Sequence, residues 1–191
     1  GLAGVLTDST VTGCAAATLV EGDTAGGLAG QGSGLTVTGS YAASYLKGSH
    51  TAGLVGNLTG SAHISQSYAV GFMEAGEQAA GLCLGTGMAD VGQSYSAMLF
   101  PTDKTVQNYP LCQSGTYTST HFLASERFHF EGTGKDLGVT YADLTNPDKW
   151  AGFFGDAFAP KSAAQSHPYN LQTTLSLTTF LYPGLAELDH W

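Results

Sequence analysis

A four-residue phrase recurs along the first half of the chain, and it constrains the fold more than any other feature. The copies are Gly1-Leu2-Ala3-Gly4, Gly27-Leu28-Ala29-Gly30, Gly53-Leu54-Val55-Gly56 and Gly81-Leu82-Cys83-Leu84-Gly85. The first three copies begin 26 residues apart, and the fourth begins after 28 and carries an inserted Leu84. A fixed period of this length is typical of a chain that stacks similar coils.

Other positions repeat with the phrase. A triplet with a central β-branched residue recurs as Thr10-Val11-Thr12, Thr36-Val37-Thr38, His63-Ile64-Ser65 and Asp90-Val91-Gly92. Next come Ser40-Tyr41-Ala42, Ser67-Tyr68-Ala69 and Ser94-Tyr95-Ser96, and we align Gly13-Cys14-Ala15 with them in the first copy. An apolar position follows at Leu19, Leu46, Met73 and Leu99. Such alternation predicts short strands with one buried face.

The repeats predict an all-β fold, a parallel β-solenoid with about three short strands in each coil of 26–28 residues. Like residues would then stack on like, about 4.8 Å apart between coils. The expected inward ladders are Leu2/Leu28/Leu54/Leu82, Val11/Val37/Ile64/Val91 and Leu19/Leu46/Met73/Leu99. A helical fold is excluded because 20 of the first 100 residues are glycine, and each interior glycine costs about 1 kcal/mol of helix stability.

The composition changes at Phe100-Pro101, where the repeat is predicted to stop. All six prolines follow residue 100, but only 7 of the 27 glycines do. We therefore expect two regions, a solenoid at residues 1–100 and an irregular, partly helical capping region at residues 101–191. In the second region we expect strands at 121–123 and 128–130, a turn at 135–138, and helices near 141–144 and from Pro147 onward.

An aromatic stripe marks the second expected helix. Trp150, Phe153, Phe154 and Phe158 fall on one helical face. We expect the stripe to pack against the last coil, because natural solenoids cover their open ends with an atypical element. A platform of exposed aromatic rings that binds carbohydrate is the alternative.

The Gly-Leu-x-Gly phrases, followed by Ser-Tyr-Ala about 14 residues later, resemble the GLUG repeat of bacterial surface proteins. That repeat occurs in large adhesin-like proteins and beside immunoglobulin-A-cleaving metalloproteases. The tail at residues 180–191 resembles the ends of GLUG-containing domains, with a final strand that carries Tyr-Pro. The resemblance implies a non-catalytic structural or adhesive module, a stalk or contact surface, in a cell-surface or secreted bacterial protein. It implies an unidentified surface protein or glycan as partner, and flanking domains in a longer chain.

Charge narrows the range of partners. The chain has 15 acidic and 6 basic residues, a formal net charge of −9, and Lys47 is the only basic residue before position 101. This balance argues against nucleic acid or an anionic membrane surface as partner, since both favour clusters of Lys and Arg. No apolar run approaches the roughly 18 residues of a membrane-spanning helix, so we expect no membrane insertion in this segment.

The repeats lack the residue patterns that a catalytic or metal site would need. The acids Asp8, Glu21, Asp23, Glu74 and Glu77 fall at predicted turns, and no two acids share a column on adjacent coils. A glycoside hydrolase needs paired carboxylates, and a structural zinc site needs closely spaced His and Cys. His121 and His129 are too far apart for a local chelate. We therefore predict no enzyme, no cofactor, and no catalytic or metal-binding residue.

Two further patterns concern the threonines and the cysteines. The Thr10/Thr12 and Thr36/Thr38 pairs resemble the threonine arrays of ice-binding solenoids, but the array ends after two coils, so we expect these threonines only to favour the strand surface. Among the cysteines, Cys14 and Cys83 are nearly three coils apart, too far for a disulfide, whereas pairing of Cys83 with Cys112 stays open. An accessory domain of a secreted protease or glycan-degrading enzyme, and a carbohydrate-binding cap at residues 101–191, remain alternative functions.

Overall fold

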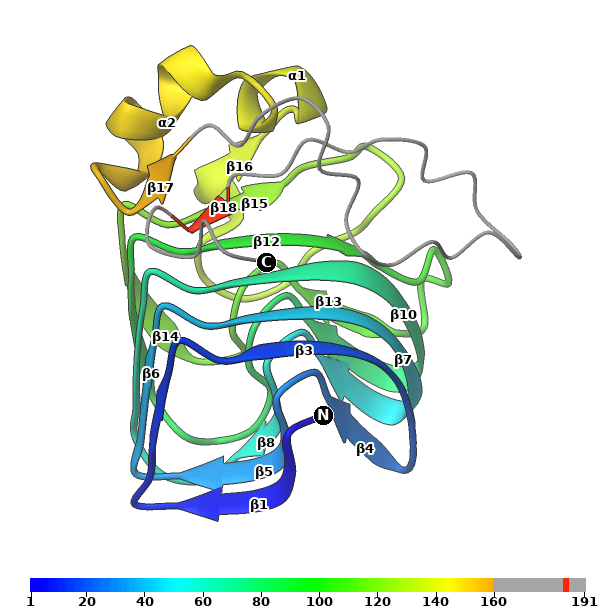
Figure 1. Cartoon of the computed structure of the whole chain (residues 1–191). Coiled ribbons are helices and arrows are strands. Elements are labelled where there is room, and N and C mark those ends of the chain that lie inside the picture. Colours follow the sequence, from blue (N-terminus) through cyan, green and yellow to red (C-terminus); the bar gives the residue numbers. More distant parts are fainter. Residues whose placement is uncertain (160–183, 186–191) are drawn as a thin grey trace.

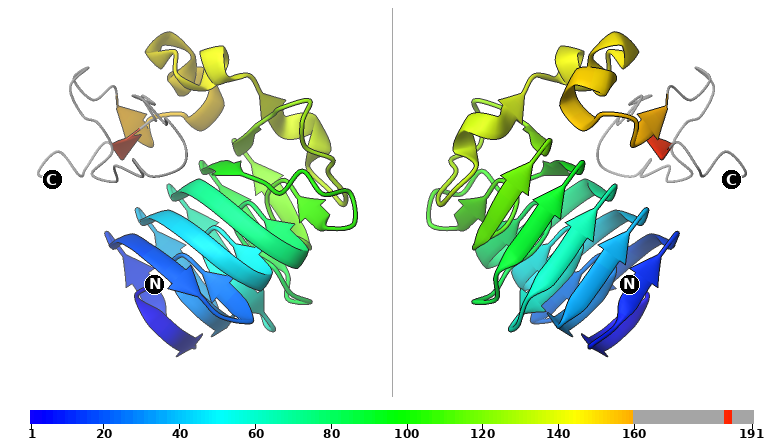
Figure 2. Two further views of the ribbon diagram at one scale, coloured as in Figure 1. Left: turned by 90° about the vertical axis from the view of Figure 1, so that its right-hand side faces the viewer. Right: turned by 90° about the vertical axis from the view of Figure 1, so that its left-hand side faces the viewer.

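The main body of the protein is a parallel β-solenoid of about five turns, seen in a computed structural model that describes residues 1–159 and 184–185. The coils stack from the N-terminus, in blue, toward two short helices, in yellow (Figure 1). Side views show successive strands lying in parallel rows (Figure 2). The predicted fold class is confirmed, and every strand pair within the solenoid is parallel.

The coils contribute to three sheets. Sheet A contains β1 (Ala3–Thr7), β5 (Ala29–Ser33) and β8 (Val55–Leu58). Sheet B contains β2 (Thr10–Thr12), β6 (Leu35–Thr38), β9 (Ala62–Ser65), β11 (Ala89–Gly92) and β14 (Gly115–Thr118). Sheet C contains β3 (Ala15–Glu21), β7 (Tyr41–Ala52), β10 (Tyr68–Ala80), β12 (Tyr95–Leu99), β15 (His121–Leu123) and β16 (Gly138–Val139). Two further strands, β4 (Thr24–Gly26) and β13 (Gln107–Tyr109), pair with the second halves of β7 and β10.

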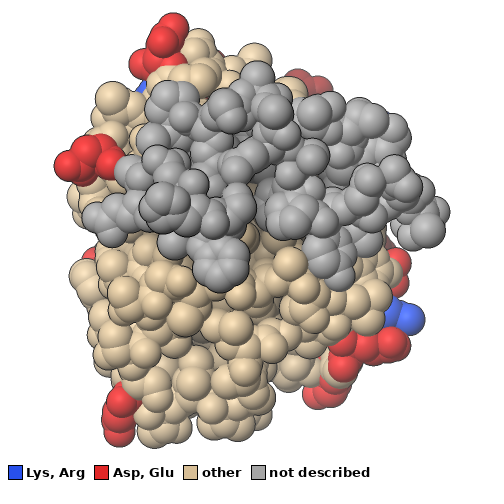
Figure 3. Space-filling view, in the orientation of Figure 1, with Lys and Arg blue, Asp and Glu red and all other residues tan. Residues whose placement is uncertain are grey.

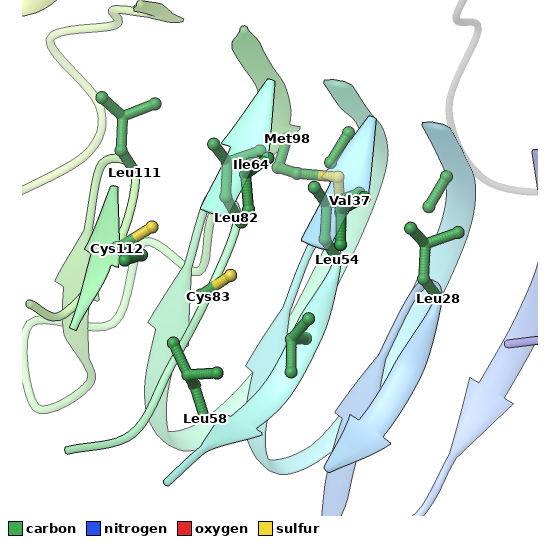
Figure 4. Close-up of a cluster of buried hydrophobic side chains, with 14 of the residues drawn as sticks. Leu28, Val37, Leu54, Leu58, Ile64, Leu82, Cys83, Met98, Leu111 and Cys112 are labelled. Atoms are coloured by element: carbon green, nitrogen blue, oxygen red, sulfur yellow. The ribbon is translucent and has the colours of Figure 1, made fainter. Parts of the chain in front are cut away.

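Two of the expected ladders fill the interior. Leu28, Leu54 and Leu82 are buried one above the other, whereas Leu2, in the first coil of this stack, is 47% exposed. Val37 and Ile64 are register partners and both are buried (Figure 4). Burial of this aliphatic surface, which no single coil achieves alone, is the main force that holds the stack together.

The third ladder differs from the prediction by one residue at each end. The inward column is Val20, Leu46, Met73 and Phe100. Leu19 instead pairs with Tyr45 and is 59% exposed, and Leu99 pairs with Phe72 on the outer face. In this sheet, register partners in the first and second coils are 26 residues apart in sequence, whereas partners in the second and third coils are 27 apart. Since side chains alternate between faces, a slip of one residue moves a side chain from the core to the surface.

The same offset corrects the alignment of the first Ser-Tyr-Ala triplet. The Cys14 amide donates a hydrogen bond to Ser40 Oγ at 3.1 Å, and Ala15 is the register partner of Tyr41. Cys14 therefore occupies the serine position of the triplet, and not the tyrosine position.

The repeat pattern predicts that the solenoid stops at Phe100-Pro101. The structure instead continues through a fifth coil. Residues of β13, β14 and β15 pair in parallel with β10, β11 and β12 of the preceding coils. Leu111 accepts the Leu82 amide at 2.6 Å and so extends the leucine ladder. The fifth coil escapes detection because Pro110 and Gln113 replace the glycines of the phrase, and Tyr117 occupies the position of Val91.

Aromatic side chains of the segment after β15 cover the C-terminal end of the interior. The rings of Phe128 and Phe130 contact Phe100 with centroid distances of 5.8 and 4.9 Å, and Phe130 also contacts Phe122 at 5.0 Å. The strand predicted at 128–130 is wrong, because this segment forms no ladder. Its backbone is joined to the fifth coil by a bond from the Glu131 amide to the Asn108 carbonyl, at 2.7 Å.

The helices follow the last coil at the C-terminal end of the stack (Figure 1), and their aromatic side chains pack on outward residues of sheet C. The helices are the 3₁₀ turn η1 (Lys135–Leu137), α1 (Tyr141–Leu144) and α2 (Pro147–Phe154), followed by β17 (Phe158–Ala159) antiparallel to β18 (Gly184–Leu185). Trp150 and Phe154 are buried, as predicted, with Phe154 5.7 Å from the Tyr95 ring. The rest of the predicted tail, residues 180–183 and 186–191, lies outside the described residues.

Candidate functional site

A column of stacked tyrosines forms the apolar outer face of sheet C. Tyr41, Tyr68 and Tyr95 stack with ring centroids 4.8 Å apart in each pair. Phe158 closes over Tyr68 and Tyr95 with edge-on contacts at 6.2 and 5.3 Å. Burial raises the pKa of Tyr68, since the phenolate would be stripped of water. This column and the rings of α2 and β17 form a second core on the outside of the solenoid.

A second outward column runs beside the tyrosines. It contains Leu19, Tyr45, Phe72 and Leu99. The Tyr45 and Phe72 rings stack with centroids 5.6 Å apart. The repeat spacing predicts Leu19 and Leu99 in the interior, so this surface column is not recognisable from the sequence pattern.

The second column ends in a cleft of about 400 Å³, which we call the aromatic cleft. Its lining residues are Phe72, Leu99, Phe100, Thr102, Leu123, Ala124, Ser125, Arg127, Phe128 and Tyr141. The coils supply the floor, and the walls come from the segments after β12 and β15 and from the start of α1. Clefts with apolar walls and a few polar groups are the usual form of a small-ligand site.

The aromatic cleft can provide ring faces, hydroxyls and one fixed positive charge. Phe72 and Tyr141 supply aromatic surface, Thr102 and Ser125 supply hydroxyl groups, and Arg127 supplies a guanidinium. Aromatic faces suit the C–H face of a sugar ring, while a guanidinium suits a hydroxyl or carboxylate substituent. This combination of groups is suited to binding a sugar. A carbohydrate-binding cap at residues 101–191 is one of the alternative functions that the sequence suggests.

A charged corner lies where sheet C bends toward sheet A. Lys47 lies between Glu21 and Glu74 in one column and forms a 3.3 Å ion pair with Glu21. The hydrogen bond between Tyr45 and Glu74 raises the pKa of the tyrosine to about 12. Because both members of the ion pair are at least half exposed, the pair contributes little to stability.

The acids of this corner lie in strands and not in the turns that the sequence predicts. Glu21 lies in β3, and Glu74 and Glu77 lie in β10, because the long strands continue through the expected turns. Glu21 and Glu74 share a column, but Lys47 occupies the coil between them. The expectation that no two of these acids stack on adjacent coils is confirmed for this column.

The outer face of sheet B is flat and polar. Its outward pairs are Thr10/Thr12, Thr36/Thr38, His63/Ser65, Asp90/Gly92 and Thr116/Thr118. His63 Nδ1 lies 3.1 Å from Asp90 Oδ2, and the Thr116 hydroxyl donates to Asp90 Oδ1 at 3.1 Å. The threonine array therefore returns in the fifth coil, which the repeat pattern of the sequence does not reveal. The hydrogen-bonded His63–Asp90 pair interrupts the array in the third and fourth coils.

The histidines considered as metal ligands lie in separate surroundings. The His121 ring packs 4.7 Å from Phe153 and its Nδ1 lies 3.2 Å from the Leu137 carbonyl oxygen, whereas His129 is exposed. Burial lowers the pKa of His121. Within residues 1–159 and 184–185, no three His, Cys, Asp or Glu side chains gather as a metal site would require.

Charged groups are sparse on the visible surface of the solenoid, and most of that surface is uncharged (Figure 3). No helix in the described part of the chain is long and apolar enough to cross a membrane.

Comparison with known proteins leaves the family open. No protein-family model matches the chain, and neither the curated proteins nor the solved structures give a significant match. The resemblance to the GLUG repeat therefore stays a prediction from the sequence.

Proposed function

We propose that this chain is a non-catalytic adhesive module of a bacterial cell-surface or secreted protein, and that it binds a glycan in the aromatic cleft. The proposal rests on one observation: the outward column through Tyr45 and Phe72 leads into an apolar cleft with a single guanidinium at its rim. The solenoid supplies a rigid floor for this cleft, and the less regular segments that follow β12 and β15 supply its walls.

Rigidity of the floor supports a role in recognition. Phe72 lies in the middle of β10, which is hydrogen-bonded to β7 on one side and β12 on the other. Its ring therefore needs little ordering when a ligand binds, and the entropy cost of association is correspondingly small. Binding residues are commonly carried by loops on a rigid scaffold, as in the 100–104 and 124–128 segments here.

A glycan array probed with the full chain tests the proposal. We expect binding to a limited set of glycans, and we expect the variant Phe72→Ala or Arg127→Ala to reduce it at least tenfold. The matched control is Thr118→Ala on the outer face of sheet B, which should bind like the wild type. Circular dichroism and the thermal midpoint of each variant distinguish loss of the site from loss of the fold.

Three results would overturn the proposal. The first is equal glycan binding by the wild type and the Phe72→Ala and Arg127→Ala variants, and the second is no glycan binding by the wild type. The third is turnover, seen as new reducing ends or unsaturated products from a glycan, if Glu74→Gln abolishes it. The third result would favour the alternative of a glycan-degrading enzyme.

A further inference from the structure

Two cysteines that are distant in sequence meet in the interior of the solenoid. Cys83 belongs to the fourth coil and Cys112 to the fifth, and the two form a parallel bridge beside the leucine ladder. Both thiols are free in this structure, and the side chains are 2% and 1% exposed. Figure 4 shows both side chains projecting into the interior from neighbouring coils.

Backbone hydrogen bonds fix the two residues opposite each other. The Cys83 amide donates to the Leu111 carbonyl at 3.3 Å, and the Gln113 amide donates to the Cys83 carbonyl at 3.0 Å. These two bonds flank Cys112 on either side. Register partners on parallel strands lie about 4.8 Å apart, inside the range of about 4.4–6.8 Å between Cα atoms that a disulfide tolerates.

Two hydrogen bonds between the Tyr117 hydroxyl and the Cys112 backbone also hold Cys112 in this position. The Cys112 amide donates to the Tyr117 hydroxyl at 3.3 Å, and that hydroxyl donates to the Cys112 carbonyl at 3.1 Å. The thiol groups are themselves close enough that Cys112, together with burial, raises the pKa of the Cys83 thiol. The buried Cys83 thiol is therefore protonated and unreactive in the folded chain.

We propose that Cys83 and Cys112 are a disulfide site that joins the fourth and fifth coils when the protein folds in an oxidising environment. The optimal Cβ separation of a disulfide, about 3.8 Å, is shorter than the strand spacing, so the coils must close slightly. The pair lies outside the regular strands, where the backbone is free to make that small adjustment.

The oxidant is a small disulfide of the oxidised glutathione class. A cysteine thiolate attacks one sulfur of that disulfide, forms a mixed disulfide and releases one glutathione thiol. The second cysteine then attacks the mixed disulfide, forms the Cys83–Cys112 bond and releases the second glutathione. The two cysteines together lose two protons and two electrons, which the two glutathione molecules carry away. Because both thiols are buried, this happens during folding or through local opening of the fifth coil.

The experiment refolds the full chain with a glutathione redox buffer and counts thiols after denaturation. We expect one titratable thiol, Cys14, and a mass lower than that of the reduced chain by about 2 Da. Peptide mapping without reductant should link Cys83 to Cys112. The thermal midpoint of the oxidised chain should exceed that of the reduced chain by roughly 5–10 °C.

Variants make the result specific. Cys83→Ala should fold, because Ala29 fills the same column position in the second coil, and should lose the difference between oxidised and reduced midpoints. Cys112→Ala should behave in the same way, and Cys14→Ser should keep the full difference. Three titratable thiols after oxidative refolding, or a bond that includes Cys14, would overturn the proposal.

Discussion

At the residue scale, the structure explains why the two halves of the repeat recur together. The first glycine of the second, third and fourth Gly-Leu phrases faces the third residue of the Ser-Tyr-Ala triplet, or Ser96 in the fourth coil, across the same coil. A Cβ atom on Gly53 would lie 2.4 Å from the Ala69 Cβ and 2.1 Å from the Gly81 carbonyl oxygen of the next coil. Glycine and a small residue are thus required as a pair, because the chain approaches itself here too closely for a larger side chain.

Gly53 and Gly76 offer a matched test of this contact. Gly53→Ala should lower the free energy of unfolding by about 3 kcal/mol or more, since backbone atoms cannot move away from the added methyl group. Gly76→Ala, in the same coil, meets its nearest atom at 3.7 Å and should change stability by less than about 1 kcal/mol. Urea unfolding measures both values, and similar losses for the two variants would contradict the proposed packing.

Serine has an equally specific role in the triplet. Ser67 Oγ accepts the amide of Ser40 from the preceding coil at 3.2 Å and donates to the Ser65 carbonyl at 2.8 Å. Ser94 repeats the arrangement, accepting the Ser67 amide at 3.1 Å and donating to the Gly92 carbonyl at 2.7 Å. The buried hydroxyls therefore continue the coil-to-coil hydrogen bonding through a corner where the ladder of sheet B ends.

Removal of one hydroxyl should have a measurable cost. Ser67→Ala leaves the Ser40 amide buried without its acceptor, so we expect a loss of about 1–3 kcal/mol in the free energy of unfolding. Ser67→Thr retains the hydroxyl and should lose less, since Thr120 occupies this position in the fifth coil and donates to the Thr118 carbonyl at 2.9 Å. Chemical denaturation of the two variants decides the point, and an unchanged stability of Ser67→Ala would contradict it.

At the element scale, the fifth coil and α2 meet at His121. The ring replaces a tyrosine of the stacked column and lies 4.7 and 5.6 Å from the rings of Phe153 and Phe154. Burial lowers its pKa below the ordinary value of 6.5, despite an opposing effect of the bond to the Leu137 carbonyl. The folded chain therefore prefers the neutral imidazole.

The sign of the pH dependence follows from this lowered pKa. The contribution of the neutral ring is fully present above pH 6.5 and is lost as the pH falls from 6.5 toward the lower pKa of the folded state, because the unfolded chain binds the proton more readily. His121→Gln should reduce the loss of stability between about pH 7.5 and 5.5, whereas the exposed His129→Gln should not. Urea unfolding at the two pH values measures these changes in stability. An equal loss of stability in the wild type and both variants would contradict the role given to His121.

Elements were predictable from the sequence where their residues repeat, and less so where they do not. The columns of Val37 and Leu54 were found because apolar residues recur at one period. The shift of Leu19 to the surface was missed because Leu19 and Val20 are both apolar, so periodicity alone cannot choose between them. The fifth coil was missed because Tyr117 and Pro110 break the pattern, although the backbone pairing continues.

The aromatic cleft illustrates the same limit. The sequence placed candidate recognition in the C-terminal region, and Arg127 and Tyr141 do come from there. Its floor, however, includes Phe72 and Leu99 of the coils. Which coil residues face outward beside these loops depends on the register of sheet C, and the spacing of the repeats did not determine that register to within one residue.

At the scale of the whole molecule, the two ends of the solenoid differ. In the first coil Leu2, Val5 and Leu19 are each about half exposed or more, and β1, β2 and β3 are edge strands of the three sheets. At the other end Phe128 and Phe130 cover the interior. An uncovered end would expose both apolar side chains and unpaired backbone groups.

Expression of residues 1–100 alone should therefore give an aggregating product. Such a fragment lacks the fifth coil, so β11 and β12 become edge strands and the buried Phe100 loses its aromatic cover. Light scattering and size-exclusion chromatography, with the full chain as control, measure the outcome. A monomeric fragment that unfolds cooperatively would show that four coils are sufficient.

The hydrogen bonds between coils also determine how the protein would respond to mechanical load. They run along the direction in which the coils stack, so a force applied along that direction loads the coils in series. The chain should then peel one coil at a time and not rupture as a unit, with each coil of 26 residues releasing about 9 nm of extended chain. Single-molecule stretching would show a ladder of such steps. A module of this kind, placed between an anchored cell and its ligand, would dissipate a sudden pull by yielding in small increments.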